Sequence, residues 1–182
     1  MTISNVDIRG NAVVGQDAHI TLVLGGARSG KSRYAESIVV ARPPPWFYVA
    51  TAEPLDDEML ARIRAHQARR GADWRTLEAP HDLAGALASI PAGAAVLVDC
   101  LTLWLTNLML ANADVEAAIA RLERALARAA PTVLVSNEVG SGIVPDNALA
   151  RRFRDAQGHL NQRMAARADR VEIGRASCRE RV

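Results

Sequence analysis

The most constraining feature of this sequence is a glycine-rich segment that directly follows a short apolar run. The run from Ile20 to Leu24 is typical of a buried strand, and the residues from Lys31 to Ala41 are typical of a helix. The segment between them matches the pattern Gly-x-x-x-x-Gly-Lys-Ser/Thr at every fixed position. Its residues are Gly25, Gly26, Ala27, Arg28, Ser29, Gly30, Lys31 and Ser32. This order of strand, loop and helix predicts a phosphate-binding loop, so all eight residues are candidates for binding a nucleotide.

The chemistry of this loop assigns roles to its last two residues. Lys31 is predicted to reach the terminal phosphates as the catalytic cation, and Ser32 to hold Mg²⁺. Lys31 is also the only lysine among 22 basic residues. That bias indicates that position 31 needs a compact ammonium, because the planar fork of arginine would not replace it. The alternative interpretation is a glycine-rich turn with a coincidental Gly-Lys-Ser.

Asp99 is the natural partner of this loop. It ends the apolar run that begins at Ala95, and a carboxylate there would lie at the carboxyl edge of a parallel sheet, where open α/β folds bind ligands. We expect it to hold Mg²⁺ or a water molecule beside Ser32. The alternative is that Asp99 caps the helix that begins near Leu101, a position that aspartate favours. The two roles are compatible.

Short apolar runs alternate with helical patterns along most of the chain. Strands are expected at 20–24, 46–50, 74–77, 95–99 and 132–136. Helices are expected at 31–41, 56–69, 81–89, 101–111, 115–129 and 148–168. This alternation predicts an α/β fold of the P-loop NTPase (RecA-like) kind, with a mostly parallel sheet and helices on both of its faces.

Composition limits the partners and the location of the chain. Its 182 residues suit one domain, and 49% of them are hydrophobic, which is enough for a core. The net charge of +2 gives no electrostatic case for binding nucleic acid. No apolar run reaches the roughly 18 residues that a membrane span needs. The start of the chain lacks a signal-peptide pattern, and two cysteines make no disulfide framework. We therefore expect a cytoplasmic protein.

Three segments and a few single residues resemble one enzyme family. The segments read GGARSGKSR at 25–33, ATAEPLDDEMLARIRAH at 50–66 and SNEVGSGIVPDNALARRFRDAQGHLNQR at 136–163. The single residues are Arg70, Trp74, Thr76 and Glu78. Together they resemble the bifunctional adenosylcobinamide kinases / adenosylcobinamide-phosphate guanylyltransferases of cobalamin biosynthesis. The resemblance runs from about Ile20 to about Val171. The phosphate loop alone is generic, whereas the third segment at this spacing is much more specific.

The resemblance implies two reactions at one nucleotide site. The first phosphorylates the aminopropanol hydroxyl of adenosylcobinamide with ATP or GTP. The second transfers GMP from GTP to the new phosphate through a GMP-histidine intermediate and gives adenosylcobinamide-GDP. The resemblance also implies a homotrimer, which nothing in the sequence pattern itself indicates.

The same resemblance assigns the nucleophile to His66. A neutral imidazole nitrogen is a competent nucleophile toward phosphorus. Without the resemblance, the sequence does not single out His66 and favours a partly buried packing histidine, because His66 lies on roughly the same helix face as Met59 and Ile63.

Further nucleotide contacts follow from the resemblance alone. They are Ala50, Thr51 with its hydroxyl, Ala52, Gln67, Ala68, Arg69, Arg70 and Glu78. If they do not bind the nucleotide, Arg69 and Arg70 would be solvated cations at a helix end, and Glu78 would be a surface acid. The loop from Asn137 to Gly140 is expected to shape the active site.

The two ends of the chain are expected to lie outside the domain. Residues 1–18 are polar and irregular, so we expect an extension there and a catalytic domain over 19–171. Residues 172–182 depart from the family pattern, which continues with an apolar strand. They equal the in-frame translation of a common sequencing adapter, so we expect a non-native tail and a truncated last strand.

Two other functions stay open from the residues alone. One is a P-loop kinase of another small hydroxylated substrate, which would not form a labelled histidine. The other is a nucleotide-binding regulator without transfer activity. A GTPase is disfavoured, because its base-reading Asn-Lys-x-Asp needs a second lysine.

Overall fold

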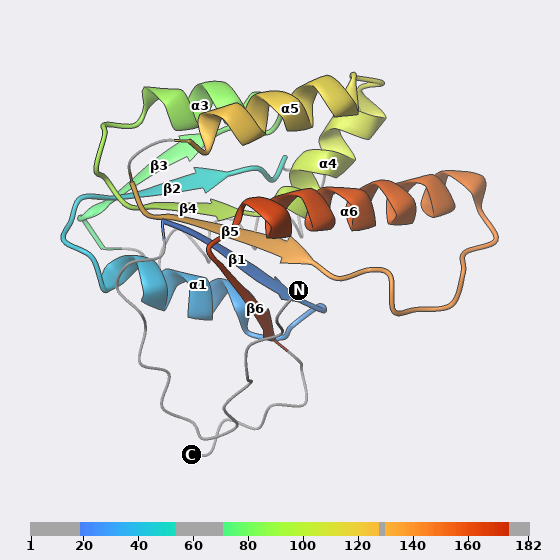
Figure 1. Ribbon diagram of the computed structural model, residues 1–182, viewed down its shortest axis with the longest axis horizontal. Coiled ribbons are helices and arrows are strands. Elements are labelled where there is room, and N and C mark those ends of the chain that lie inside the picture. The colour runs from blue at the N-terminus through green and yellow to red at the C-terminus, as the bar shows by residue number, and fades with distance from the viewer. Residues whose placement is uncertain (1–18, 54–70, 128–129, 175–182) are drawn as a thin grey trace, which may run out of the picture.

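A single parallel sheet runs through the protein (Figure 1). We analysed a computed structural model, which describes residues 19–53, 71–127 and 130–174. The strands are β1 (Ile20–Gly25), β2 (Trp46–Ala50), β3 (Trp74–Glu78), β4 (Val96–Asp99), β5 (Thr132–Asn137) and β6 (Arg170–Gly174). Their order in the sheet is β3-β2-β4-β5-β1-β6, and every neighbouring pair is parallel. The predicted α/β fold is confirmed.

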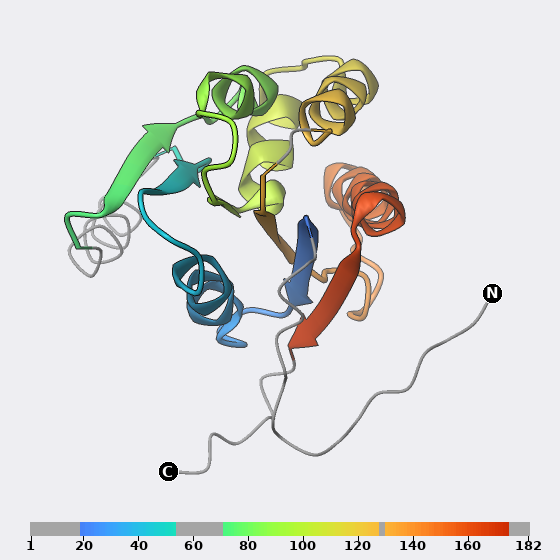
Figure 2. The same cartoon turned by 60° about the vertical axis from the view of Figure 1, so that its left-hand side comes forward.

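Helices cover both faces of this sheet (Figures 1 and 2). They are α1 (Lys31–Val40), α3 (Leu83–Ser89), α4 (Leu101–Leu110), α5 (Val115–Ala125) and α6 (Ala148–Arg167). Side chains alternate between two cores: Leu22 and Leu24 of β1 pack on the side of α3 to α6, and Val23 packs on the side of α1. Burial on both faces explains why the inner strands are almost continuous apolar runs.

The predicted elements agree with the structure to within a few residues at their ends. Helix α3 begins at Leu83 because Asp82 caps it, its carboxylate accepting a hydrogen bond from the Gly85 amide at 3.1 Å. Helix α5 ends at Ala125, earlier than expected. The helix predicted over 56–69 lies outside the described residues. None of the helices that the structure describes is long and apolar enough to cross a membrane.

Strand β6 spans the residue at which the predicted domain ends, and the domain bounds themselves stay a prediction. The domain was expected to stop at Val171, but β6 continues through Gly174 and pairs with β1 in register, from Thr21 opposite Arg170 to Gly25 opposite Gly174. An edge strand is held by backbone hydrogen bonds on one side, so it does not need an apolar run. Val171 and Ile173 accordingly point outward, and both are exposed. The origin of residues 172–182 stays a prediction.

Candidate active site

The carboxyl ends of the strands bring those predicted site residues that the structure describes to one edge of the sheet. Because all the strands are parallel, their carboxyl ends share this edge, where α/β folds bind ligands. The register places Ala50 between Glu78 on one side and Asp99 on the other. Gly25 lies opposite Asn137 in the β1–β5 pair. The phosphate loop after β1 and the loop after β5 therefore leave the sheet side by side.

The phosphate loop has a backbone that depends on its glycines. Gly30 adopts φ +80°, in the left-handed region, directly before α1. A Cβ atom on Gly25 would lie 2.6 Å from Ser29 Oγ and 2.6 Å from the Gly174 carbonyl oxygen. The Gly30 carbonyl accepts the Tyr34 amide at 3.0 Å, so the loop passes directly into the first turn of the helix. The loop therefore has the glycine-dependent backbone that a phosphate-binding loop needs, and phosphate binding by it stays a prediction.

Two polar side chains of the loop differ in their hydrogen bonding. The Lys31 ammonium donates a hydrogen bond across the loop to the Gly26 carbonyl at 3.1 Å, so it lies over the cradle. The Ser29 hydroxyl is buried and has no hydrogen-bond partner among the described residues. Such an orphaned buried hydroxyl costs stability unless a ligand or water pairs with it.

Asp99 lies half-buried at the end of β4, as predicted. Its alternative role as a helix cap is wrong, because Cys100 occupies the N-cap position of α4. Ser32 and Asp99 offer a hydroxyl and a carboxylate oxygen, the hard donors that Mg²⁺ prefers. Within the described ranges, no group of three His, Cys, Asp or Glu residues could hold a metal. The two donors Ser32 and Asp99 suit an ion such as Mg²⁺, which takes one or two protein oxygens and completes its coordination shell with waters and phosphates.

Thr51 does not present its hydroxyl to a nucleotide. The side chain is fully buried (0% exposed). Its Oγ1 donates to the Cys100 carbonyl at 2.7 Å and accepts from the Cys100 amide at 2.8 Å. The predicted hydroxyl contact is therefore corrected: this group is used inside the protein. Ala50 and Ala52, on either side of it, are half-buried at the sheet edge.

Glu78 lies at the same edge but far from the phosphate loop. It ends β3, and β2, β4 and β5 separate that strand from β1. Four strand spacings amount to about 19 Å. Glu78 and Lys31 therefore lie too far apart to contact the same phosphate group. The predicted nucleophile His66 and the candidates Gln67, Ala68, Arg69 and Arg70 lie outside the described residues.

Two buried polar groups behind this edge were missed from the sequence. Asn107 of α4 donates from Nδ2 to the carbonyls of Thr51 (2.8 Å) and Pro80 (3.0 Å). The only signal for it was an amide in the apolar sequence of α4, LTLWLTNLML.

The second buried group connects β5 to α6. Ser136 Oγ donates to Asn161 Oδ1 at 2.7 Å, and Gln157 Nε2 donates to both oxygens, at 3.0 and 2.9 Å. Asn161 Nδ2 donates to the Asn137 carbonyl at 3.1 Å. Gln157 and Asn161 are four residues apart, and this spacing on one helix face was the available signal. The group holds the start of the loop after β5.

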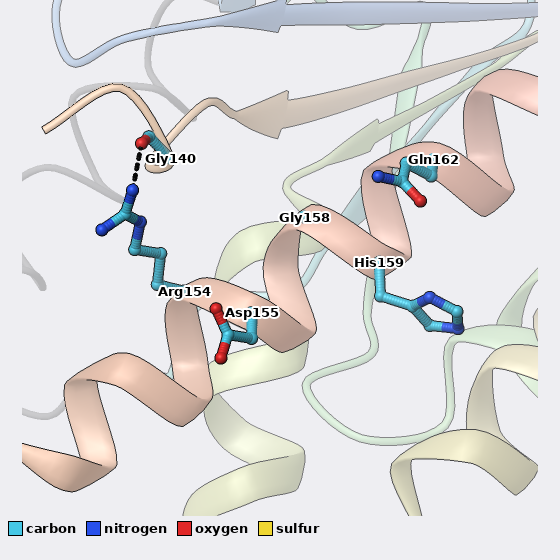
Figure 3. Close-up of a pocket in the computed structure, with 6 residues that line it drawn as sticks. All are labelled: Gly140, Arg154, Asp155, Gly158, His159 and Gln162. Atoms are coloured by element: carbon cyan, nitrogen blue, oxygen red, sulfur yellow. Dashed lines mark hydrogen bonds between the residues drawn. The ribbon is translucent and has the colours of Figure 1, made fainter. Parts of the chain in front are cut away.

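Arginines of α6 fasten the rest of that loop. Arg151 donates to the carbonyls of Pro145 and Asp146, at 2.9 and 2.6 Å, and Arg154 donates to the Gly140 carbonyl at 2.7 Å. Figure 3 shows Arg154 reaching from the helix to the Gly140 carbonyl. Both residues line a hollow of about 410 Å³. The hollow is lined by Gly140, Arg154, Asp155, Gly158, His159 and Gln162. These arginines therefore hold a loop beside the site.

The thiol of Cys100 is shielded from water beside the site. Burial, reinforced by the negative charge of Asp99, raises the pKa of Cys100 to about 11; backbone hydrogen bonds at Leu103 and Thr102 and the charge of Lys31 offset the rise only in part. The thiol therefore stays protonated at neutral pH, which argues against a nucleophilic role.

Comparison with known proteins identifies the family. The sequence pattern of the family described as "Cobinamide kinase / cobinamide phosphate guanyltransferase" matches residues 21–177. The "Bifunctional adenosylcobalamin biosynthesis protein CobP" of Pseudomonas aeruginosa is 48% identical over 157 residues, which is 82% of this chain and 89% of that protein. The proteins named CobU of Salmonella typhimurium and Escherichia coli are 45% and 41% identical over 170 residues, 82% of this chain and 92% of each relative. Because the family pattern covers most of the chain and these relatives are 41–48% identical, the chain belongs to the cobinamide kinase / cobinamide phosphate guanyltransferase family.

Proposed function

We propose that this protein is a bifunctional enzyme that phosphorylates adenosylcobinamide and then converts the product to adenosylcobinamide-GDP. The observation that carries the proposal is the placement of Lys31, Ser32 and Asp99 at one sheet edge in a member of this family. The relatives named above are called bifunctional adenosylcobalamin biosynthesis proteins, which supports two reactions on a cobinamide substrate. We propose that it acts as a homo-oligomer, by resemblance a trimer.

In the first reaction the chain mainly positions a nucleoside triphosphate, ATP or GTP. Backbone amides of residues 25–30 surround the phosphates, and Lys31 leaves its contact with Gly26 to bridge terminal phosphate oxygens. Ser32 and Asp99 would hold Mg²⁺, which neutralises charge on those phosphates when bound. The substrate hydroxyl oxygen attacks the γ-phosphorus, its proton passes to solvent, and the nucleoside diphosphate leaves.

In the second reaction His66 is the proposed nucleophile. Its neutral imidazole nitrogen attacks the α-phosphorus of GTP, and pyrophosphate leaves. An oxygen of the cobinamide phosphate then attacks the same phosphorus, and the histidine nitrogen leaves. Glu78 is proposed to contact the guanosine end of the nucleotide, in keeping with its distance from Lys31.

A double-label assay tests this proposal. GTP labelled at the γ-phosphate should label the first product, and GTP labelled at the α-phosphate should label only the second. Lys31→Arg should lower the first rate by at least about a hundredfold, since one misplaced donor at a transferring phosphate has that scale of effect. Near-normal turnover of this variant contradicts the role of Lys31.

The same assay separates the competing functions. Label transfer from the γ-position alone would indicate a kinase without guanylyl transfer. Tight GTP binding with no labelled product from cobinamide would indicate a nucleotide-binding regulator.

A further inference from the structure

We propose that Thr51 is a positioning residue for the metal-binding carboxylate: its buried hydroxyl fixes the backbone that follows Asp99 and so sets the direction of the Asp99 side chain. The inference rests on the proposed function, in which Asp99 holds Mg²⁺ together with Ser32. It assigns to Thr51 a role different from the nucleotide contact that the sequence suggested.

The hydroxyl of Thr51 uses both its donor and an acceptor on a single residue of the neighbouring strand end. Oγ1 donates to the Cys100 carbonyl at 2.7 Å and accepts from the Cys100 amide at 2.8 Å. The Thr51 amide also donates to the Asp99 carbonyl at 3.4 Å. These three contacts bracket the peptide unit between Asp99 and Cys100, so the backbone on the carboxyl side of Asp99 has little freedom.

Asn107 closes this arrangement from behind. Helix α4 begins at Leu101, immediately after Cys100, and its Asn107 donates a hydrogen bond to the Thr51 carbonyl at 2.8 Å. Thr51 is therefore hydrogen-bonded both to Cys100, which precedes α4, and to Asn107 within α4. We call Thr51, Cys100 and Asn107 the Thr51 clasp. All three side chains are buried, with exposed fractions of 0%, 6% and 4%.

The clasp matters because a metal-binding carboxylate works only when it points at the ion. Asp99 lies at the end of β4 and is itself only half-buried, so its side chain depends on a correctly placed backbone. Groups behind a metal ligand commonly orient it, and their loss weakens metal binding without removing the ligand. Thr51 satisfies this description because its contacts are to the backbone beside Asp99.

The test measures how much Mg²⁺ improves nucleotide binding. The affinity for a non-hydrolysable GTP analogue is determined by calorimetry with Mg²⁺ and with EDTA, and the ratio of the two is the metal-dependent gain. Thr51→Val removes the hydroxyl at nearly constant shape and should reduce this gain about tenfold. Affinity in EDTA should be unchanged, because the phosphate loop is intact. Thr51→Ser keeps the hydroxyl and should keep most of the gain.

Thr106→Val is the matched control. It removes a threonine hydroxyl from α4, the helix that carries Asn107. There Thr106 Oγ1 donates to the Thr102 carbonyl at 2.9 Å, away from Thr51, so the gain should be unchanged. A wild-type gain in Thr51→Val, or an equal loss in Thr106→Val, overturns the proposal. A wild-type protein without any metal-dependent gain overturns the proposed metal role itself, which is a distinguishable failure.

A second variant covers the case in which Thr51→Val does not fold. Thr51→Cys keeps a weak donor and acceptor of similar size, so the gain should fall by a smaller factor, about threefold. An unchanged gain in this folded variant overturns the proposal equally.

Discussion

Two buried amides support opposite sides of the candidate site, and they do so in different ways. Asn107 on α4 donates both its hydrogen bonds to backbone carbonyls at the ends of β2 and β3. Gln157 on α6 donates both of its bonds to side chains, those of Ser136 and Asn161. The first amide therefore fixes the course of the chain, and the second joins a cluster of side chains.

The difference lies in how replaceable each contact is. The partners of Gln157 also bond to each other, since Ser136 Oγ donates to Asn161 Oδ1 at 2.7 Å. Gln157 Oε1 is itself buried without a hydrogen-bond partner among the described residues. On the β5–α6 side, Ser136 and Asn161 thus stay bonded without Gln157, and Gln157 Oε1 is an unpaired buried atom that costs stability. On the β2–α4 side, by contrast, the Thr51 clasp joins the strand ends directly.

The largest expected effect comes from Asn107→Leu. The change leaves the buried Thr51 carbonyl and the partly buried Pro80 carbonyl without this donor, so the free energy of unfolding should fall by about 3 kcal/mol. Denaturant unfolding of the variant and the wild type measures it. Thr106→Val on the same helix should cost clearly less. A loss no greater than that of Thr106→Val would show that the backbone contacts of Asn107 are dispensable.

Alkaline pH should weaken the β2–α4 side through Cys100. Its pKa is about 11 in the folded protein against 9.0 for a cysteine thiol in water, so the unfolded chain loses the proton first. The contribution of the neutral thiol is present below pH 9 and is lost as pH rises toward 11, by about 2 kcal/mol. The fall in unfolding free energy between pH 8 and 11 should therefore be smaller in Cys100→Ala. Equal falls in both proteins would contradict the burial of an un-ionised thiol.

Gln157→Leu should have the smallest effect on stability, under about 1 kcal/mol. The substitution removes two donated bonds but also removes the unpartnered oxygen, and Ser136 and Asn161 keep their mutual bond. The same unfolding experiment measures it beside Asn107→Leu. If the two leucine variants lose the same stability, the contrast between the two sides is wrong.

Much of the fold followed from the sequence because its signals are local. The apolar runs of β1, β2, β4 and β5 and the glycine pattern between β1 and α1 each lie within a few residues. Strand β6 was harder, because it pairs through its backbone and points Val171 and Ile173 outward, so it lacks the expected apolar run.

The site was only partly predictable, for a related reason. Lys31, Ser32 and Asp99 are marked by motif and by strand position. For Thr51 the sequence predicts a hydroxyl contact with the nucleotide. It gives no sign of the true partner, Cys100, which is 49 residues away in the chain. Contacts at that separation are created by the register of the sheet. Asn107 was missed for the same reason.

The most direct test of the account concerns covalent guanylyl transfer at His66. The protein is incubated with GTP labelled at the α-phosphate, and the labelled polypeptide is tested for stability to acid and base. We expect an acid-labile, base-stable label on the wild type, no label on His66→Ala, and kinase product still formed by that variant. Label on another histidine of His66→Ala, or final product from a wild type that takes up no label, would contradict covalent transfer at His66.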